Sequence, residues 1–497
     1  MGIIIRQSIK GTVVNYIGAF IGFLTTIFVL TKFFQPEEIG LTRFIYEAAL
    51  LIAIFAQLGT SGTAFRFFPY FQSEKNNNNG FFYYLVLLPT IGICFFIPLY
   101  VLLKEPISSY FSMNASLIVD YYYWIIILIV VVVYWLTFET YSNLLMRIAI
   151  PKLIREVVVR VLLLSVYLLF AFKFFDLDLL VAGIISVYGF AMALTFIYVS
   201  RIGSISLKHD FSFIDKPLRR KIGNYTLFLI FAALSDSILA PLGLFMVSGQ
   251  LGLDHAGVYA IAFYMASVVD IPSRSISSIS SPVAAKALKE GDMGSANRLY
   301  KKVSLHQLVA GSCMFLLIWI NIDNIFSIIP NGDVWIAGKW VVFYLSLSKL
   351  FNVAFNFGAT LIAYSKYYYW TLFFTGFITV TAIVANLLLI PRMGIAGSAV
   401  ATLTATMLLA AVQQWIVLKK IKGNPFSAGM FKLLLMILVL FGLNHLLPHW
   451  SSNPFIDGAY RSFIIGVITL MSLYKLKISD EITSLMDNVF IKFKNNK

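Results

Sequence analysis

Blocks of apolar residues, each about 20 residues long, follow one another through almost the whole of this 497-residue chain, and 20 helical residues rise about 30 Å, the thickness of a bilayer's hydrocarbon core. Only 12% of the residues are charged and 59% are hydrophobic, whereas a soluble domain carries roughly 25% charged residues. Helices are the expected form, because an open strand edge would leave backbone groups without partners in lipid. The sequence therefore predicts an all-α polytopic membrane protein.

Clusters of charged residues, Pro, Gly and Asn separate the apolar blocks and divide the chain into about 14 predicted transmembrane helices. The first block is too long for the hydrophobic region of a signal peptide, so we expect it to be a permanent span. The approximate limits of the predicted spans are 12–31, 41–60, 81–103, 121–143, 155–173, 179–200, 223–246, 256–282, 303–321, 337–362, 368–390, 395–418, 431–447 and 459–476.

The distribution of Lys and Arg predicts the orientation. Of the 38 basic residues, 28 lie in the segments on the side of the N-terminus, six lie on the opposite side and four lie within spans. Because cytoplasmic segments are enriched in Lys and Arg, we expect both termini to be cytoplasmic. The net charge of +15 is then an orientation signal, and we expect no nucleic-acid partner.

We expect neither a metal ion nor a cofactor. Cys94 and Cys313 lie inside apolar runs, where free cysteines behave as small buried hydrophobes. The five histidines show no spacing typical of metal ligands. No extramembrane segment reaches forty residues, which leaves no room for a soluble catalytic domain.

Two stretches resemble each other at the start of the second and the eighth predicted spans: Pro36–Leu41 and Asp254–Tyr259. Each contains a glycine followed by an acidic residue in the next loop, 34 residues later in the first copy (Gly40 to Glu74) and 33 in the second (Gly257 to Glu290). Six spans separate the copies, so two halves of the same topology are expected, as in transporters that work by alternating access. Chance similarity between hydrophobic segments is the alternative.

The repeat predicts three parts of the chain. Residues 1–205 form an N-terminal six-helix lobe, and residues 206–422 form a second six-helix lobe in parallel pseudo-repeat. Residues 423–497 add two further transmembrane helices and a cytoplasmic tail.

Three motifs carry a resemblance to a known family: the turn Pro36–Gly40, the stretch Leu58–Ser61 leading to Arg66, and Pro391–Ala399. In their order and separation they resemble the polysaccharide flippases of the multidrug/oligosaccharidyl-lipid/polysaccharide exporter superfamily. The resemblance covers nearly the whole chain in span count and spacing. It implies two lobes in a V shape, residence in a bacterial inner membrane, and movement of undecaprenyl-pyrophosphate-linked oligosaccharide to the outer leaflet. Membrane lipid, polysaccharide polymerase and glycosyltransferases are the implied partners.

Charged residues inside spans are informative because each is costly in hydrocarbon unless it faces a partner or a wet cavity. By residue count, Lys349 and Asp236 lie near the midplane of the tenth and seventh spans. A mutual ion pair and a cavity-lining pair are both open interpretations.

Arg43 and Glu47, and likewise Asp270 and Arg274, are four residues apart, so each pair shares a helix face and can neutralise its charge. Arg274 is surrounded by serines: Ser273, Ser275, Ser277, Ser278, Ser280 and Ser281. A lipid-facing helix would not carry so many hydroxyls, so this stretch should line water or pack against another helix.

The resemblance implies a cationic cavity for the lipid pyrophosphate, and Arg43, Arg274 and Lys349 match it, with Arg66 at the cytoplasmic mouth. Arginine binds phosphate oxygens bidentately and lysine adds a point charge. Acidic residues are candidates for binding a coupling ion: Asp236, Glu47 and Asp270. Ion pairing explains the same acids equally well.

Four alternatives remain from sequence. A multidrug or small organic cation exporter of the same superfamily would share the twelve-helix core. A peptidoglycan precursor lipid flippase would share the pyrophosphate chemistry. A membrane-embedded polysaccharide polymerase or glycosyltransferase would need a sizeable catalytic outer loop, and the outer loops are short here. A structural scaffold would not need charged residues at the midplane.

Overall fold

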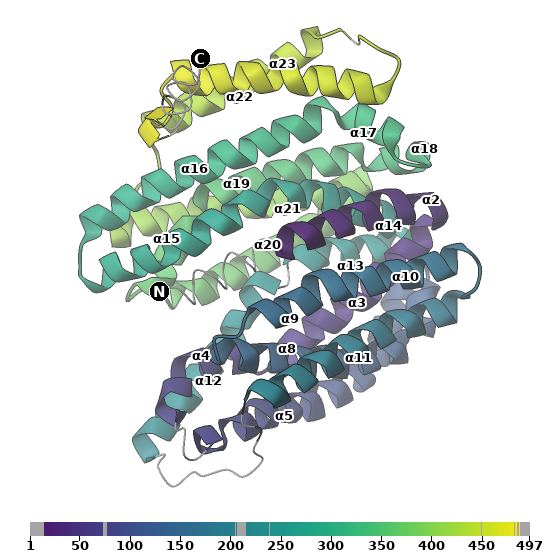
Figure 1. The fold of residues 1–497 in the computed structure, drawn as a ribbon, viewed down its shortest axis with the longest axis vertical. Helices are drawn as coiled ribbons and strands as arrows, with labels where there is room; N and C mark the ends of the chain where they lie inside the picture. Colours follow the sequence, from purple (N-terminus) through teal and green to yellow (C-terminus); the bar gives the residue numbers. More distant parts are fainter. Residues whose placement is uncertain are drawn as a thin grey trace. The chain divides into compact units, whose positions relative to one another are not determined.

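The structure of the chain is a computed structural model, which describes residues 14–72, 77–203, 205, 215–237, 239–448, 450–481, 483, 484 and 487. All regular elements among these residues are helices (Figure 1). The predicted all-α fold class is therefore confirmed. Two compact units are present, unit 1 over Met1–Gly257 and unit 2 over Val258–Lys497. The lobe limits predicted from the internal repeat stay a prediction.

Each of the 14 predicted spans overlaps a helix of the structure. Within the described ranges, eleven helical segments are long and apolar enough to cross a membrane. The other predicted spans fall on helices that are interrupted or shorter, including Pro241–Leu251 and Ala428–Asn444. The chain is a multi-pass membrane protein.

Unit 1 begins with the helical segment Val14–Phe33, which contains the π-helix η1 (Thr25–Leu30) and ends in α2 (Thr31–Phe33). The remaining elements of unit 1 are α3 (Pro36–Ala56), α4 (Thr60–Phe71), η2 (Asn77–Gly80), α5 (Phe81–Leu102), α6 (Lys104–Phe111), α7 (Ser116–Asp120), α8 (Tyr122–Leu144), α9 (Ala149–Leu153), η3 (Ile154–Val158), α10 (Val159–Ala171), α11 (Leu177–Ile202), α12 (Lys216–Ser237) and α13 (Leu239–Leu251).

Helix α8 is the centre of unit 1, packed against α3, α4, α5 and α11 (Figure 1). In lipid the hydrophobic effect does not drive helices together, so close packing has to hold them. Gly92 of α5 illustrates this, since a Cβ there would collide with the carbonyl oxygen of Ala56 in α3. An aromatic core closes one end of the unit around Phe67, Phe81 and Tyr141.

Local sequence explains where α3 and α4 begin. Pro36 stands in the first turn of α3, and the side chains of Gln35 and Glu38 form a capping box that satisfies two backbone N–H groups. Gly59 has a φ of +68° and precedes α4. This left-handed residue lies at the end of the second predicted span and separates α3 from α4, because glycine adopts such a conformation without steric cost.

Unit 2 contains most of α14 (Leu253–Ala266), which begins at the end of unit 1. The other elements of unit 2 are η4 (Ser267–Asp270), α15 (Ile271–Lys289), α16 (Met293–Ile320), α17 (Ile322–Ile328), α18 (Gly332–Trp335), η5 (Ile336–Gly338), α19 (Lys339–Tyr364), α20 (Trp370–Met393), α21 (Ile395–Ile416), η6 (Val417–Ile421), α22 (Ala428–Leu446) and α23 (Pro454–Lys475).

Helices α15, α16, α19, α20 and α21 pack together in unit 2, and α22 and α23 pack against α16 (Figure 1). Aromatic residues fix α22 in place. The ring of Phe441 lies 6.1 Å from that of Phe343 in α19 and stacks at 6.2 Å on Trp319 in α16. The two C-terminal helices are therefore integral to unit 2.

Candidate functional site

Three charged side chains meet inside unit 2, and we call them the charge cluster: Asp270, Arg274 and Lys349. One carboxylate oxygen of Asp270 lies 3.3 Å from an Arg274 guanidinium nitrogen. The other lies 3.5 Å from the Lys349 ammonium nitrogen. The i,i+4 pairing of Asp270 with Arg274 follows the prediction, and Lys349 reaches the same carboxylate from α19.

A break in the helix positions the cluster. The 3-10 turn η4 ends at Asp270, and Pro272 stands in the first turn of α15. Proline has no N–H and suits a helix start, so the chain restarts its helix here. The hydroxyl of Ser273 donates to the carbonyl of Asp270 at 2.8 Å. Asp270 is thus fixed at the junction, within one helical turn of Arg274.

The cluster has two cations for one carboxylate, and its members differ in exposure. The side chains of Asp270 and Lys349 are 14% and 23% exposed, whereas that of Arg274 is 72% exposed. Lys349 also lies over the ring of Phe263, with its nitrogen 5.3 Å from the ring centre. An exposed guanidinium is costly in hydrocarbon, so Arg274 should face water or an anion. The arrangement can bind an anionic group through Arg274.

Some serines around Arg274 pack against another helix and others are exposed, which are the two environments expected for this stretch. Ser277 accepts a hydrogen bond of 2.7 Å from Gln307 of α16, and Ser280 is buried. Arg274 and Ser275 are exposed. The side chain of Ser278 lies outside the described residues. One face of α15 therefore packs on α16, and the face that carries Arg274 is open.

In unit 1, Arg43 does not form the expected close pair with Glu47. Among the described residues these two side chains share no ion pair within 4.0 Å, and Arg43 instead contacts the hydroxyl of Thr26 at 3.5 Å. The two side chains interact through their charges without a direct ion pair. Glu47 is half-buried one turn further along α3.

Arg66 lies in α4 as an exposed residue. Its guanidinium carbon stands 4.2 Å from the ring centre of Tyr225 in α12. Such a cation–π contact holds the arginine without neutralising its charge. The side chain of Asp236, a candidate for ion coupling, lies outside the described residues.

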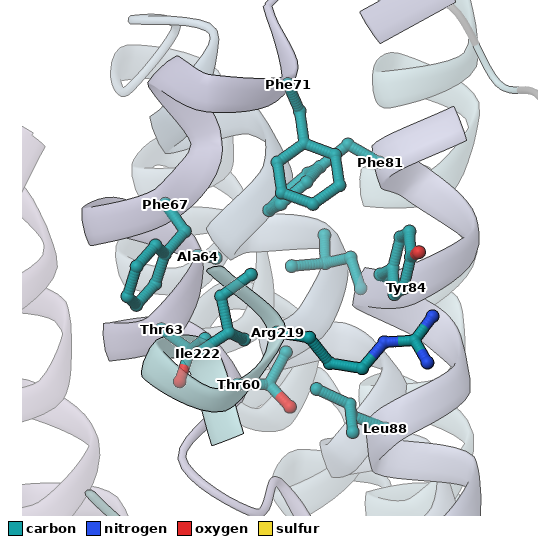
Figure 2. Close-up of a pocket in the computed structure, with 11 residues that line it drawn as sticks. Thr60, Thr63, Ala64, Phe67, Phe71, Phe81, Tyr84, Leu88, Arg219 and Ile222 are labelled. Carbon is teal, nitrogen blue, oxygen red and sulfur yellow. The ribbon is translucent and has the colours of Figure 1, made fainter. Parts of the chain in front are cut away.

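A cavity of about 270 Å³ lies between α4, α5 and α12, and its lining includes Phe67, the residue that follows Arg66. Its walls are mainly aromatic and aliphatic, with Phe67, Phe71 and Phe81 at one side. Figure 2 shows the Arg219 side chain extended across this cavity toward Tyr84 and Leu88. The cavity therefore holds one cationic side chain, that of Arg219, between apolar walls.

A second charged network joins α8 to η3 and α10. Arg155 lies 2.9 Å from Glu139 and 3.2 Å from Glu156, and Glu156 lies 2.8 Å from Arg160. Glu156 and Arg160 are four residues apart and share a helix face. Each acid in this network already has an arginine partner.

Sequence analysis missed a buried ion pair in α23. Arg461 donates to Asp457 at 2.9 Å, to the side-chain oxygen of Asn444 at 3.0 Å and to the carbonyl of Leu447 at 2.9 Å. The side chains of Arg461 and Asp457 are only 5% and 1% exposed. Their i,i+4 spacing was a signal, but Arg461 was counted among the six basic residues on the side opposite the N-terminus. Within the described part of the chain, no three His, Cys, Asp or Glu side chains group as metal ligands do.

No protein-family profile matches this chain, and no curated protein matches its sequence. Solved structures match its fold. The lipid II flippase MurJ, in an inward closed conformation, has a TM-score of 0.69 over 95% of this chain and 100% of the flippase chain, at 12% identity. An inward-facing multidrug resistance MATE transporter of the MOP superfamily has a TM-score of 0.59 over 81% of this chain and 94% of its own, at 16% identity.

A MATE transporter in the straight conformation has a TM-score of 0.52 over 84% of this chain and 96% of its own, at 17% identity. The chain has the fold of the MOP-superfamily transporters. These similar proteins are a lipid II flippase and MATE transporters. At identities this low, the likeness establishes the fold alone.

Proposed function

We propose that this protein is a flippase that moves undecaprenyl-pyrophosphate-linked oligosaccharide from the cytoplasmic to the outer leaflet of a bacterial inner membrane by alternating access. The observation that carries the proposal is the charge cluster, in which two cations share one carboxylate and Arg274 remains 72% exposed. A diphosphate can occupy that guanidinium bidentately. A carrier of organic cations would need more carboxylates than cations at its binding site.

The extent of the fold also supports a lipid-linked substrate. The likeness to the lipid II flippase covers 95% of this chain, and that to the two MATE transporters covers 81% and 84%. In the proposed role, Lys349 adds positive charge for the pyrophosphate beside Arg274. Arg43 and Arg66 are the proposed substrate-binding cations of unit 1, with Arg66 at the cytoplasmic mouth. Asp236, Glu47 and Asp270 are the proposed sites for a coupling ion.

The proposal places both termini in the cytoplasm and assigns the chain no catalytic step. Its product would serve cell-surface polysaccharide or O-antigen synthesis. Glycosyltransferases would supply the lipid-linked sugar, and a polysaccharide polymerase would use it on the outer side. A peptidoglycan precursor lipid remains an alternative cargo, because it presents the same pyrophosphate to the cluster.

Flipping in proteoliposomes tests the proposal, with labelled undecaprenyl-pyrophosphate oligosaccharide as the probe. We expect protein-dependent flipping that Arg274→Gln and Lys349→Gln abolish. Arg298→Gln is the matched control, because Arg298 is an exposed arginine outside the charge cluster that donates a hydrogen bond to its helical neighbour Ser295. Transport of a small organic cation without any lipid movement would instead establish the exporter function. Movement of lipid II alone would identify the peptidoglycan cargo.

A further inference from the structure

A second cavity of unit 1, of about 470 Å³, lies where the end of α3, the start of α4 and the last turns of α8 meet. We call it the amide cavity. Its polar lining consists of five uncharged side chains and one ion pair: Gln57, Thr60, Ser61, Thr140, Asn143, and Glu139 with Arg155. Ligand sites of proteins occupy about 300–1,000 Å³, so this cavity is large enough for a small molecule.

Gln57 lines this space, and its side-chain oxygen is buried. Gln57 is 6% exposed, and its side-chain nitrogen donates to the carbonyl of Val133 at 2.8 Å and to the hydroxyl of Thr137 at 3.0 Å. These two bonds fix which end of the amide is the nitrogen. The oxygen has no hydrogen-bond partner in the described structure. It therefore remains a buried acceptor.

The hydroxyls of the cavity are also left as acceptors. Thr60 donates its single hydrogen to the carbonyl of Gln57. Thr140 donates to the carbonyl of Leu136 at 2.8 Å, so the 2.8 Å contact between Ser61 and Thr140 must have Ser61 as its donor. A hydroxyl has one hydrogen and two lone pairs. All three hydrogens are thus used inside the protein.

Two more oxygens complete this acceptor set. Glu139 uses one carboxylate oxygen for Arg155 at 2.9 Å, and the other has no partner among the described residues. The side-chain oxygen of Asn143 is likewise without a partner over the same part of the chain. Buried polar atoms without partners are uncommon in native proteins and call for an occupant. The occupant that suits these oxygens is one that donates hydrogen bonds.

Charge and size separate the two kinds of donor that would fit. Arg155 lies against Glu139 and compensates its charge, so a further cation would meet a guanidinium within a few ångströms. The volume of about 470 Å³ is also far larger than one ion requires. Water alone takes about 30 Å³ per molecule and would be displaced by a larger polar ligand. A neutral, hydroxyl-rich molecule satisfies both conditions.

We infer that the amide cavity binds a sugar unit of the transported glycan, whose hydroxyls donate to the oxygens of Gln57, Glu139 and Asn143. This inference rests on the proposed function, because it assigns a second part of the same substrate to the protein. The cations bind the pyrophosphate, and the amide cavity recognises the uncharged sugar. Recognition of glycan and of phosphate is then carried by different residues.

Two probes separate these contributions: undecaprenyl pyrophosphate without sugar, and the same lipid carrying a neutral tetrasaccharide. Binding is measured for the wild type, Asn143→Leu and Ser61→Ala. We expect Asn143→Leu to weaken binding of the tetrasaccharide lipid about tenfold, the effect of one or two hydrogen bonds. Binding of the sugar-free lipid should stay within about twofold. Asn143→Leu should not lower the melting temperature, because it removes an acceptor that lacks a partner.

Asn386→Leu is the matched control. Asn386 is a buried asparagine of α20 whose side-chain oxygen also lacks a partner within the described ranges, and it does not line the amide cavity. It should leave binding of both lipids unchanged. Ser61→Ala, which loses one hydroxyl and little volume, repeats the test if Asn143→Leu folds poorly.

Three results would overturn the inference. If the wild type binds both lipids and the cavity variants bind the tetrasaccharide lipid normally, the sugar site is wrong and the flippase proposal stands. If the variants change only the sodium or proton dependence of transport, the cavity holds a cation. If the wild type binds neither lipid, both proposals fail together.

Discussion

Gly40 of α3 packs directly against the carbonyl oxygen of Leu253, with which a Cβ at position 40 would collide. The contact has a counterpart, since a Cβ on Gly257 would collide with the carbonyl oxygen of Pro36. Gly40 lies four residues after Pro36, which Gly257 contacts. Gly257 lies four residues after Leu253, which Gly40 contacts. The two stretches identified as a sequence repeat therefore pack against each other reciprocally, at the starts of α3 and α14.

Gly40→Ala and Gly257→Ala should each destabilise the protein, because the obstacle is backbone and cannot rotate away. We expect a loss of about 1–3 kcal/mol, the range for overpacked sites. Thermal unfolding in detergent measures it. Gly376→Ala in α20 is the control, since a Cβ there meets nothing within 4 Å and alanine favours a helix. Equal melting temperatures for all three variants would contradict the close packing.

Asp457→Leu should be among the single substitutions that lower the free energy of unfolding most. Arg461 would keep its charge while 5% exposed and would lose its ionic partner. Breaking a buried pair costs about 3–5 kcal/mol. Glu290→Ala is the control, because Lys286 and Glu290 form an i,i+4 pair at 3.9 Å that is exposed and worth less than about 1 kcal/mol.

The double variant Asp457→Leu with Arg461→Met sharpens that test. If the cost of Asp457→Leu arises from an uncompensated buried charge, replacing both partners by apolar residues should restore most of the stability. Chemical denaturation of the wild type, Asp457→Leu, Arg461→Met and the double variant gives the coupling free energy between the two positions. Additive losses would show that packing, and not charge, is responsible.

How much of this molecule was predictable depends on whether the signal is local. The spans could be predicted because run length and hydropathy lie in consecutive residues, and Asp270 with Arg274 because helical periodicity makes them neighbours. The partner of Lys349 could not be predicted in this way. A pair with Asp236 was one of two open interpretations and lies outside the described residues, and α19 brings Lys349 to Asp270 at 3.5 Å. Only the packing of α19 against η4 makes that pair.

Neutral residues explain the other omissions. Charges stand out in a span because they are costly in lipid, but an amide such as Gln57 or Asn143 gives no comparable signal. Its importance appears only when the hydrogen bonds around it are counted. For Arg43, the hydroxyl of Thr26 on another helix decides its contact, and no pattern within α3 predicts that.

The tail after α23 should release from unit 2 in acid. Glu481 lies 2.6 Å from Lys302 of α16, and this contact, with a hydrogen bond from Ser479, lowers the pKa of the Glu481 carboxyl from 4.5 to about 2. A lowered folded pKa means that the docking free energy is complete above about 4.5 and is lost as the pH falls toward 2.

Hydrogen exchange of residues 476–484 between pH 6 and pH 2.5 would measure this release, after correction for intrinsic rates. Lys302→Met removes the main cause of the shift, so its tail should exchange faster already at pH 6. Lys301→Met changes the neighbouring lysine and serves as the control. A tail whose protection in the wild type does not depend on pH would show that Glu481 contributes nothing to docking.

Asp270→Asn tests the charge cluster from the opposite direction to removal of a cation. The carboxylate now lies against both Arg274 at 3.3 Å and Lys349 at 3.5 Å, so it competes with any phosphate for them. Its neutralisation should tighten binding of undecaprenyl pyrophosphate, by about tenfold if one ion pair worth roughly 1–1.5 kcal/mol is released. Flipping should slow nonetheless, because a substrate held more tightly leaves more slowly.

Affinity measured against salt concentration distinguishes this account from a structural one. Stronger binding through freed cations should show a steeper loss of affinity with added salt than in the wild type, because exposed charges are screened. Asp323→Asn is the matched control, since Asp323 pairs with Lys339 at 2.5 Å outside the cluster. Weaker binding by Asp270→Asn, with unchanged folding, would mean that Asp270 orients the cations and does not restrain them.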